Sequence, residues 1–235
     1  MTIADPESEF FDYIKDASFP CVGAKSALAQ NAIKTIIMSD FADESKDLAL
    51  YLALLEFGEN LDLESPIVQS FAAIFAETRT GDEIEFEMLL WERLRAIQKV
   101  DAYMGNDWDE ETDSDPHSPK FSMSIGGTSF FIIGLHPKAS RPARRFKYPT
   151  FIFNSTAQFA KLRADGRFEK MRQIIRERDK ALAGNINPML TDYGDRSEAR
   201  QYSGRMLPEE WEAPFDPKEP VNVPPHYRAK VGHKL

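Results

Sequence analysis

The chain has 235 residues, of which 42% are hydrophobic and 29% charged, and its formal net charge is −9. Such a chain can bury a core without disulfides or a structural metal, so we expect one domain over residues 1–235. The single cysteine, Cys21, excludes an internal disulfide and any multi-cysteine zinc or iron–sulfur site. The negative charge argues against nucleic acid and anionic membranes as partners, because both would repel the protein.

The first ten residues carry acidic side chains, whereas a secretory signal needs a basic patch followed by an apolar run. No stretch of the sequence approaches the apolar length of a membrane-spanning helix. We therefore expect a cytoplasmic protein without membrane attachment. The sequence leaves the oligomeric state open, and a homodimer is compatible with it.

The first hundred residues are predicted to be mainly helical. Asp43 suits the N-cap of a helix, and Gly58 suits the end of the same helix. Asp82, with Glu85 three residues later, forms a capping-box pattern that predicts the start of a long amphipathic helix. The predicted helical segments are 10–14, 19–41, 48–57, 65–75 and 82–97.

The second half of the chain is predicted to mix strands and helices. Residues 105–120 contain six acids and two prolines, which indicates a surface loop. The predicted elements after it are a strand at 121–125, a hairpin turn at Gly126-Gly127, a buried strand at 129–133, a strand at 150–153, a helix from 157, a basic helix over 168–182 that ends at Gly184, and a proline-rich arm over 208–225. The pattern predicts an α+β fold: a helical N-terminal half packed on a small antiparallel β-sheet, with an extended C-terminal arm.

One histidine stands out because it follows the apolar run 129–133. His136 leads into a turn in which Arg141, Arg144 and Arg145 share a face. An imidazole beside several guanidinium groups suits an anionic cofactor that needs an axial ligand, and haem, with its iron and two propionates, meets both demands. The alternative is a buried core histidine beside a solvated basic turn.

Cys21 is a second candidate iron ligand. A cysteine behind a proline, near the start of a helix, can have a lowered thiol pKa, and its thiolate can bind iron. The alternative is that Cys21 is a small buried apolar residue, which is the common role of a free cysteine.

Two groups of basic residues are less specific. Acids interleave with the lysines and arginines of the basic helix, which favours a solvated face with ion pairs over a nucleic-acid footprint. Three further arginines, in a segment that contains glycine and serine, could bind a carboxylate or pair with nearby acids. These arginines are Arg196, Arg200 and Arg205, and the nearby acids are Asp192, Asp195 and Glu198.

Several motifs between Phe19 and about Trp211 resemble those of the YqcI/YcgG family. Each motif is short, so the resemblance depends on their combination. The motifs are Phe19-Pro20-Cys21, Gly134-Leu135-His136-Pro137, Ala139-Ser140-Arg141, Ala143-Arg144-Arg145-Phe146, Phe153-Asn154 with Gln158-Phe159, Met171-Arg172 with Ile175-Arg176, Asn187-Pro188-Met189-Leu190, and Ser197-Glu198-Ala199-Arg200-Gln201-Tyr202-Ser203-Gly204.

The resemblance implies a haem b enzyme, because characterised members of this family use haem and dioxygen to hydroxylate a guanidino nitrogen. We therefore expect a monooxygenase that acts on arginine or a related small molecule and takes electrons from an unidentified donor. In this interpretation His136 is the expected iron ligand, and Cys21 is its rival for that role. Arg141, Arg144 and Arg145 hold the haem propionates.

The same resemblance suggests how a substrate is held. Glu198 is expected to receive the guanidinium group through paired charge-assisted hydrogen bonds. One departure concerns position 156: where relatives are expected to carry a histidine soon after Phe153-Asn154, this chain has Ser155-Thr156. The alternative function is haem binding without oxygenase turnover, as in a haem carrier or gas sensor. The two functions would share the proximal iron ligand and differ in the distal pocket.

Overall fold

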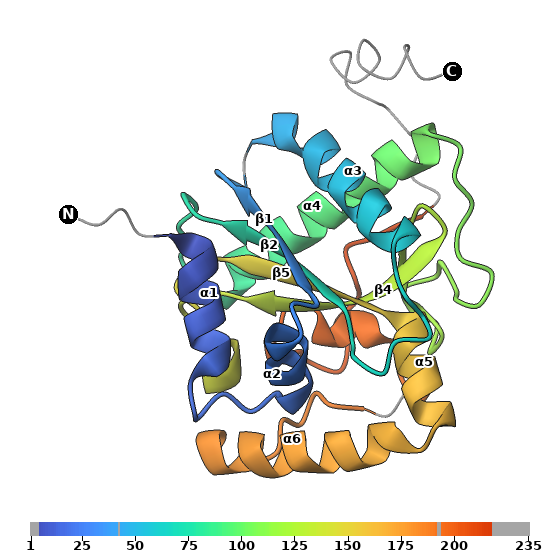
Figure 1. The fold of residues 1–235 in the computed structure, drawn as a ribbon. Helices are drawn as coiled ribbons and strands as arrows, with labels where there is room; N and C mark the ends of the chain where they lie inside the picture. Colours follow the sequence, from blue (N-terminus) through green and yellow to red (C-terminus); the bar gives the residue numbers. More distant parts are fainter. Residues whose placement is uncertain (1–4, 42, 192–193, 218–235) are drawn as a thin grey trace.

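A computed structural model describes residues 5–41, 43–191 and 194–217. It shows one β-sheet with helices on both faces (Figure 1). The helices are α1 (Pro6–Lys15), α2 (Val22–Ala29), α3 (Asp47–Glu59), α4 (Glu83–Tyr103), α5 (Thr156–Ala164) and α6 (Arg167–Ala183). The strands are β1 (Ile33–Met38), β2 (Ser70–Phe75), β3 (Met123–Ile125), β4 (Thr128–Leu135) and β5 (Thr150–Ser155). Single 3₁₀ turns lie at Glu44–Lys46, Pro142–Arg144 and Glu198–Gln201.

The sheet has five strands in the order β1-β2-β5-β4-β3. β1 and β2 are parallel, and every other neighbouring pair is antiparallel. The α+β class predicted from the sequence is confirmed. The predicted sheet was too small and wholly antiparallel, because it lacked β1 and β2.

Both missing strands lie where the sequence pattern predicted helices. The helix predicted over 19–41 is wrong in its second half: α2 ends at Ala29, Asn31 takes a left-handed φ of 54°, and the β-branched run of β1 follows. The helix predicted over 65–75 is wrong because β2 is a strand. All six residues of β2 are buried, so both faces are apolar and the alternation that marks a half-exposed strand is absent.

The other predicted elements are confirmed near their expected positions. The Asp82 side chain caps α4 by accepting hydrogen bonds from the backbone N–H groups of Ile84 and Glu85, both at 2.9 Å. Gly126 and Gly127, with φ of 59° and 74°, form the turn between β3 and β4. The proline-rich arm is described only as far as residue 217, and the rest of it lies outside the described residues.

The period-two alternation of the strands divides the core between the two faces of the sheet. On one face, aromatic side chains such as Phe130 and Phe153 pack with α3 and α4 in the larger cluster of buried residues. On the other face, Ile152 and Leu135 pack in a smaller cluster with Phe10 of α1. The smaller cluster leaves room on this second face, and the candidate site lies there.

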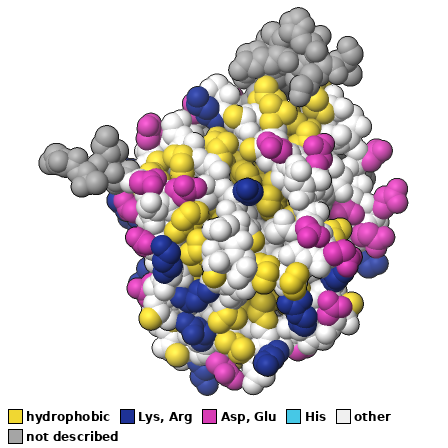
Figure 2. Space-filling model, viewed as in Figure 1, with side chains coloured by type: hydrophobic (Ala, Val, Ile, Leu, Met, Phe, Trp, Pro, Cys, Tyr) yellow, Lys and Arg dark blue, Asp and Glu magenta, His cyan; other side chains and the backbone are white. Residues whose placement is uncertain are grey.

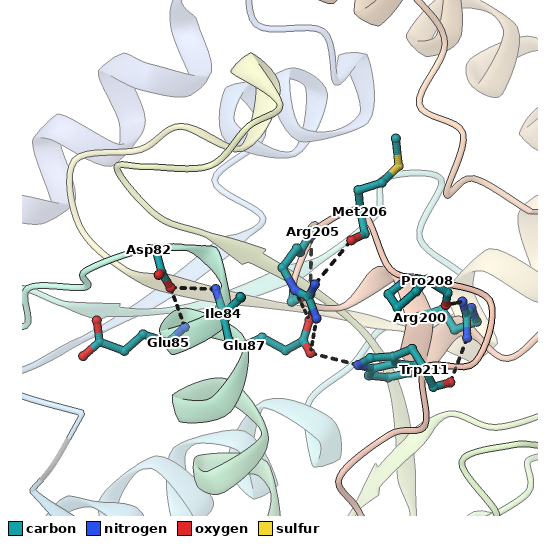
Figure 3. Close-up of polar contacts among 10 residues, drawn as sticks. Asp82, Ile84, Glu85, Glu87, Arg200, Arg205, Met206, Pro208 and Trp211 are labelled. Atoms are coloured by element: carbon teal, nitrogen blue, oxygen red, sulfur yellow. Dashed lines mark hydrogen bonds and ion pairs between the residues drawn. The ribbon is translucent and has the colours of Figure 1, made fainter.

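Glu87 of α4 forms hydrogen bonds with the segment that follows the 3₁₀ turn Glu198–Gln201 (Figure 3). The buried carboxylate of Glu87 accepts hydrogen bonds from Arg205 at 3.0 Å, from Trp211 Nε1 at 2.8 Å and from Ser203 Oγ at 2.9 Å. Because a charged carboxylate strengthens each of these bonds, Glu87 holds the segment against the larger cluster.

Replacing Glu87 by glutamine is expected to lower the free energy of unfolding by about 2 kcal/mol, because a charged acceptor shared by three donors is lost. Urea denaturation measures the change. The matched control is Glu209→Gln, which removes the acid of the exposed pair with Arg196 and should have little effect. Equal midpoints for the two variants would contradict the anchoring role of Glu87.

Candidate functional site

A cavity of about 340 Å³ lies between the second face of the sheet and the helices that cover it. We call it the α6 cavity. Its volume is within the range of small-molecule sites, roughly 300–1,000 Å³. Its sheet wall consists of alternate residues of two neighbouring strands, Phe131 and Ile133 of β4 and Ile152 and Asn154 of β5. The strand alternation therefore builds an apolar floor with a few polar groups at its edge.

Helix α6 forms the opposite wall of the cavity with one face. Its lining residues are spaced three and four apart, as one face of a helix requires: Phe168, Met171, Arg172, Ile175, Arg176 and Asp179. The sequence predicted a solvated helix laced with ion pairs, and the Arg172–Glu169 pair fits that prediction. The face of α6 that lines the cavity does not fit that prediction, because it forms a cavity wall. Lysines and arginines gather among apolar side chains over α6 in Figure 2.

Cys21 lines the α6 cavity at the N-terminus of α2. Its sulfur caps this helix and accepts a hydrogen bond from the backbone N–H of Ala24 at 3.4 Å. Burial raises the pKa of the Cys21 thiol, although the N–H groups of α2 and the nearby cations Arg144 and Lys25 oppose that rise. Cys21 is therefore a thiol in a site that already holds the groups able to stabilise a thiolate.

Two of the three predicted propionate ligands line the cavity. Arg144 donates hydrogen bonds to the carbonyl oxygens of Gly134 at 3.0 Å and Gln201 at 3.3 Å, and burial lowers its pKa to about 10. Arg141 pairs with Asp179 of α6. Arg145 is exposed, does not line the cavity, and donates to carbonyl oxygens of its own loop. Arg144 thus places a desolvated positive charge in the cavity wall.

Glu198 lines the α6 cavity as predicted for a substrate-binding acid. Its Oε1 accepts hydrogen bonds from Ser122 Oγ at 2.7 Å and from the Tyr202 hydroxyl at 2.8 Å. Burial raises the pKa of Glu198 to about 8, and these two hydrogen bonds only partly oppose it. The carboxyl group is therefore largely protonated at neutral pH in the empty cavity, and a cation docked beside it would favour ionisation.

His136 does not line the α6 cavity. It lies at the end of β4, and its ring stacks on Phe86 of α4, with centroids 4.4 Å apart. The side chain is buried, and its Nδ1 has no hydrogen-bond partner among the described residues. The structure therefore keeps the His136 ring out of the α6 cavity, whose wall includes Cys21, Arg144 and Glu198.

The burial of His136 predicts a pH-dependent stability. Burial lowers its pKa below the ordinary value of 6.5, and the neighbouring Arg144 adds to the effect while Glu83 and Asp82 oppose it. The unfolded chain therefore takes up a proton that the folded chain resists. The free energy of unfolding should fall as the pH drops below 6.5, by up to about 1.4 kcal/mol per pH unit.

Urea midpoints measured across this range test the prediction. His136→Phe, which keeps an aromatic ring beside Phe86, should remove that part of the slope. The control His117→Gln changes an exposed histidine and should keep the slope. A wild-type slope in His136→Phe would contradict the assignment.

The sequence did not single out several polar residues that the structure brings to the site. Ser122 precedes β3, and its hydroxyl lies 2.7 Å from that of Thr156, a cavity residue at the start of α5. Ser70 donates to Asn154 Oδ1 at 2.7 Å, and both line the cavity. Among these residues the sequence drew attention to Thr156, which stands where relatives are expected to carry a histidine. Ser122 carries no local signal, because a serine in an alternating strand is common.

The arginines of the C-terminal segment pair with acids other than those expected. Arg196 pairs with Glu209, and Arg205 pairs with Glu87. Arg200 donates to backbone carbonyl oxygens, among them that of Trp211 at 2.9 Å. Glu198 is instead hydrogen-bonded to Ser122 and Tyr202, and therefore remains directed to the cavity rather than to these arginines.

Fold and site together define an α+β protein with a partly open, mainly apolar cavity that holds a thiol, a half-buried arginine and a buried carboxyl group. A sequence profile of the YqcI/YcgG family matches residues 10–216, and the chain belongs to this family. Comparisons with curated proteins and with solved structures find no match. None of the helices in the described part of the chain combines the length and apolar character needed to cross a bilayer.

Proposed function

We propose that this protein is a haem-dependent monooxygenase that hydroxylates a guanidino nitrogen of arginine or a related small molecule. The proposal rests on family membership and on one observation. The α6 cavity combines, within a single mainly apolar cavity, a soft metal ligand, a half-buried cation suited to a carboxylate, and a buried carboxyl group suited to a guanidinium.

The residues of the cavity fit a haem. An iron porphyrin needs apolar walls and one or two protein ligands to the metal, so the absence of any cluster of three or more His, Cys, Asp or Glu among the described residues does not conflict with it. Cys21 is the candidate ligand in the cavity wall, whereas His136 is not in that wall. Iron would favour the thiolate of Cys21 and overcome the rise in pKa that burial causes.

The arginines at the cavity suit the haem propionates. Arg144 is half-buried, and the hydrogen bonds described for it go to neutral carbonyl oxygens. An anion placed beside it would recover much of the free energy that burial of its charge costs. Arg141 shares this part of the wall through its contact with Asp179 on α6. Arg145 has no part in this proposal.

A guanidinium substrate would dock against Glu198. The two groups match in charge and planar geometry, and the low dielectric of the enclosure strengthens their hydrogen bonds. The bound haem supplies oxygen activation. The residues of the chain orient the guanidino nitrogen, exclude water and move protons. In the overall reaction, dioxygen, two electrons from an external donor and two protons convert a guanidino N–H into N–OH and release one water.

Absorption spectra and oxygen consumption test the proposal together. Protein produced with haem supplementation should show a stoichiometric Soret band, and L-arginine should stimulate oxygen uptake in the presence of an electron donor. A Soret band without substrate-dependent oxygen uptake would indicate a haem carrier or gas sensor. A well-folded protein without a Soret band would refute both functions.

A further inference from the structure

A chain of hydroxyl groups connects Glu198 to a second point of the α6 cavity. Glu198 Oε1 lies 2.7 Å from Ser122 Oγ, which lies 2.7 Å from Thr156 Oγ1. Ser122 is fully buried and does not line the cavity, whereas Glu198 and Thr156 both do. The chain therefore leaves the cavity at Glu198, passes behind its wall through Ser122, and returns to it at Thr156.

The hydrogen bonds of this chain are satisfied in either direction. With Glu198 ionised, the hydroxyl of Thr156 donates to Ser122, which donates to Glu198, and the Tyr202 hydroxyl donates to the same oxygen. With Oε1 protonated, Glu198 donates to Ser122 and Ser122 donates to Thr156. The Tyr202 hydroxyl then donates to the Phe130 carbonyl oxygen, 3.3 Å away. Both states keep every hydroxyl paired within the protein or directed into the cavity.

We propose that Ser122 and Thr156 form a proton relay that carries the proton of Glu198 to water in the α6 cavity when substrate binds to the monooxygenase proposed above. The inference rests on that proposed function, because the docking guanidinium requires the ionised form of Glu198. The displaced proton needs a path out of a site that the substrate now covers.

The transfer moves one proton and no electrons. The Oε1–H bond of Glu198 breaks as an O–H bond forms on Ser122, the Ser122 proton passes to Thr156, and the Thr156 proton passes to water in the cavity, which carries it to solvent. Glu198 regains a proton when product leaves and water re-enters the cavity.

Stopped-flow mixing of the haem-loaded protein with L-arginine, followed with a pH-indicator dye, tests the relay before any turnover. Thr156→Val and Ser122→Ala should both slow proton release. Thr156→Val should leave the amount of proton released and the arginine affinity unchanged. In steady-state turnover Thr156→Val should lower kcat by about 100-fold with little change in KM, the lower end of the usual contribution of a positioned proton donor. Thr156→Ser restores the hydroxyl and should restore both rates.

Thr112→Val is the matched control, because the hydroxyls of Thr112 and Ser129 form a similar 2.6 Å pair and neither residue lines the cavity. Rates in Thr156→Val equal to those of wild type or of Thr112→Val would overturn the relay. If the wild-type protein neither binds L-arginine nor releases a proton, the proposed function fails and the relay fails with it. Loss of rate in Thr156→Val that Thr156→Ser does not restore would assign Thr156 a structural role and overturn the relay.

Discussion

Replacing Cys21 by alanine is expected to abolish stoichiometric haem binding. Cys21 is the iron ligand in the proposed function, and its side chain lines the α6 cavity. Loss of a direct ligand should lower the affinity for haem by more than the roughly 10–100-fold that loss of an outer-shell partner costs a metal site. A haem titration followed at the Soret band measures the change, and circular dichroism verifies that the variant is folded.

His136→Phe provides the comparison, since both residues were candidate ligands by sequence. It removes an imidazole that lies outside the cavity, so it should retain a stoichiometric Soret band. The reduced wild-type protein under carbon monoxide should show a band in the position typical of thiolate ligation. The opposite pattern, in which Cys21→Ala binds haem and His136→Phe does not, would return the iron to His136 and remove it from the α6 cavity.

The sequence predicted the fold where local chemistry determines it. The Asp82 cap and the Gly126-Gly127 turn depend on a few neighbouring residues, and both lie where they were expected. β1 and β2 depend on long-range pairing instead. One core cluster buries each face of β2, so its apolar run shows no period-two alternation. Only its pairing with β5 on one edge and β1 on the other reveals that it is a strand.

The sequence identified several residues of the candidate site, but it did not show which of them lie together in the fold. Glu198, Cys21 and Arg144 carried recognisable chemistry, and the fold brings them to one cavity. His136 looked more suitable than Cys21 as an iron ligand, because the sequence shows only that it follows a strand. Which side of the sheet a residue faces after a strand ends depends on the turn that follows, here fixed by the hydrogen bond from the His136 backbone N–H to the Arg144 carbonyl oxygen at 3.1 Å.

The positions of Tyr202 and Ser203 depend on Gly134, and the local sequence does not explain why a glycine is needed there. Gly134 donates its N–H to the Tyr202 carbonyl oxygen at 2.7 Å. A Cβ at this position would lie 2.6 Å from the Phe86 ring and 2.9 Å from that carbonyl oxygen. Gly134 therefore allows the Glu198 segment to approach the sheet, and this requirement is visible only in three dimensions.

Replacing Glu198 by glutamine is expected to remove most of the affinity for a guanidinium ligand. Glutamine has the same shape, and its carbonyl oxygen can accept the hydrogen bonds of Ser122 and Tyr202, so the cavity wall should stay intact. The charge is lost, however, and removal of one partner of a buried charged pair costs about 2–5 kcal/mol. L-Arginine should therefore bind at least roughly 30-fold more weakly, as calorimetric titration of the haem-loaded protein would show.

The pH dependence of binding separates a role of the Glu198 charge from a role of its shape. The pKa of Glu198 is about 8 in the empty cavity, so below that pH a docking guanidinium must displace a proton. Affinity for L-arginine should rise with pH by up to about tenfold per unit and level off above the pKa, while Glu198→Gln should bind weakly at every pH. The exposed Glu177→Gln should retain the wild-type profile. An affinity that is flat with pH in the wild-type protein would mean that the guanidinium does not dock at Glu198.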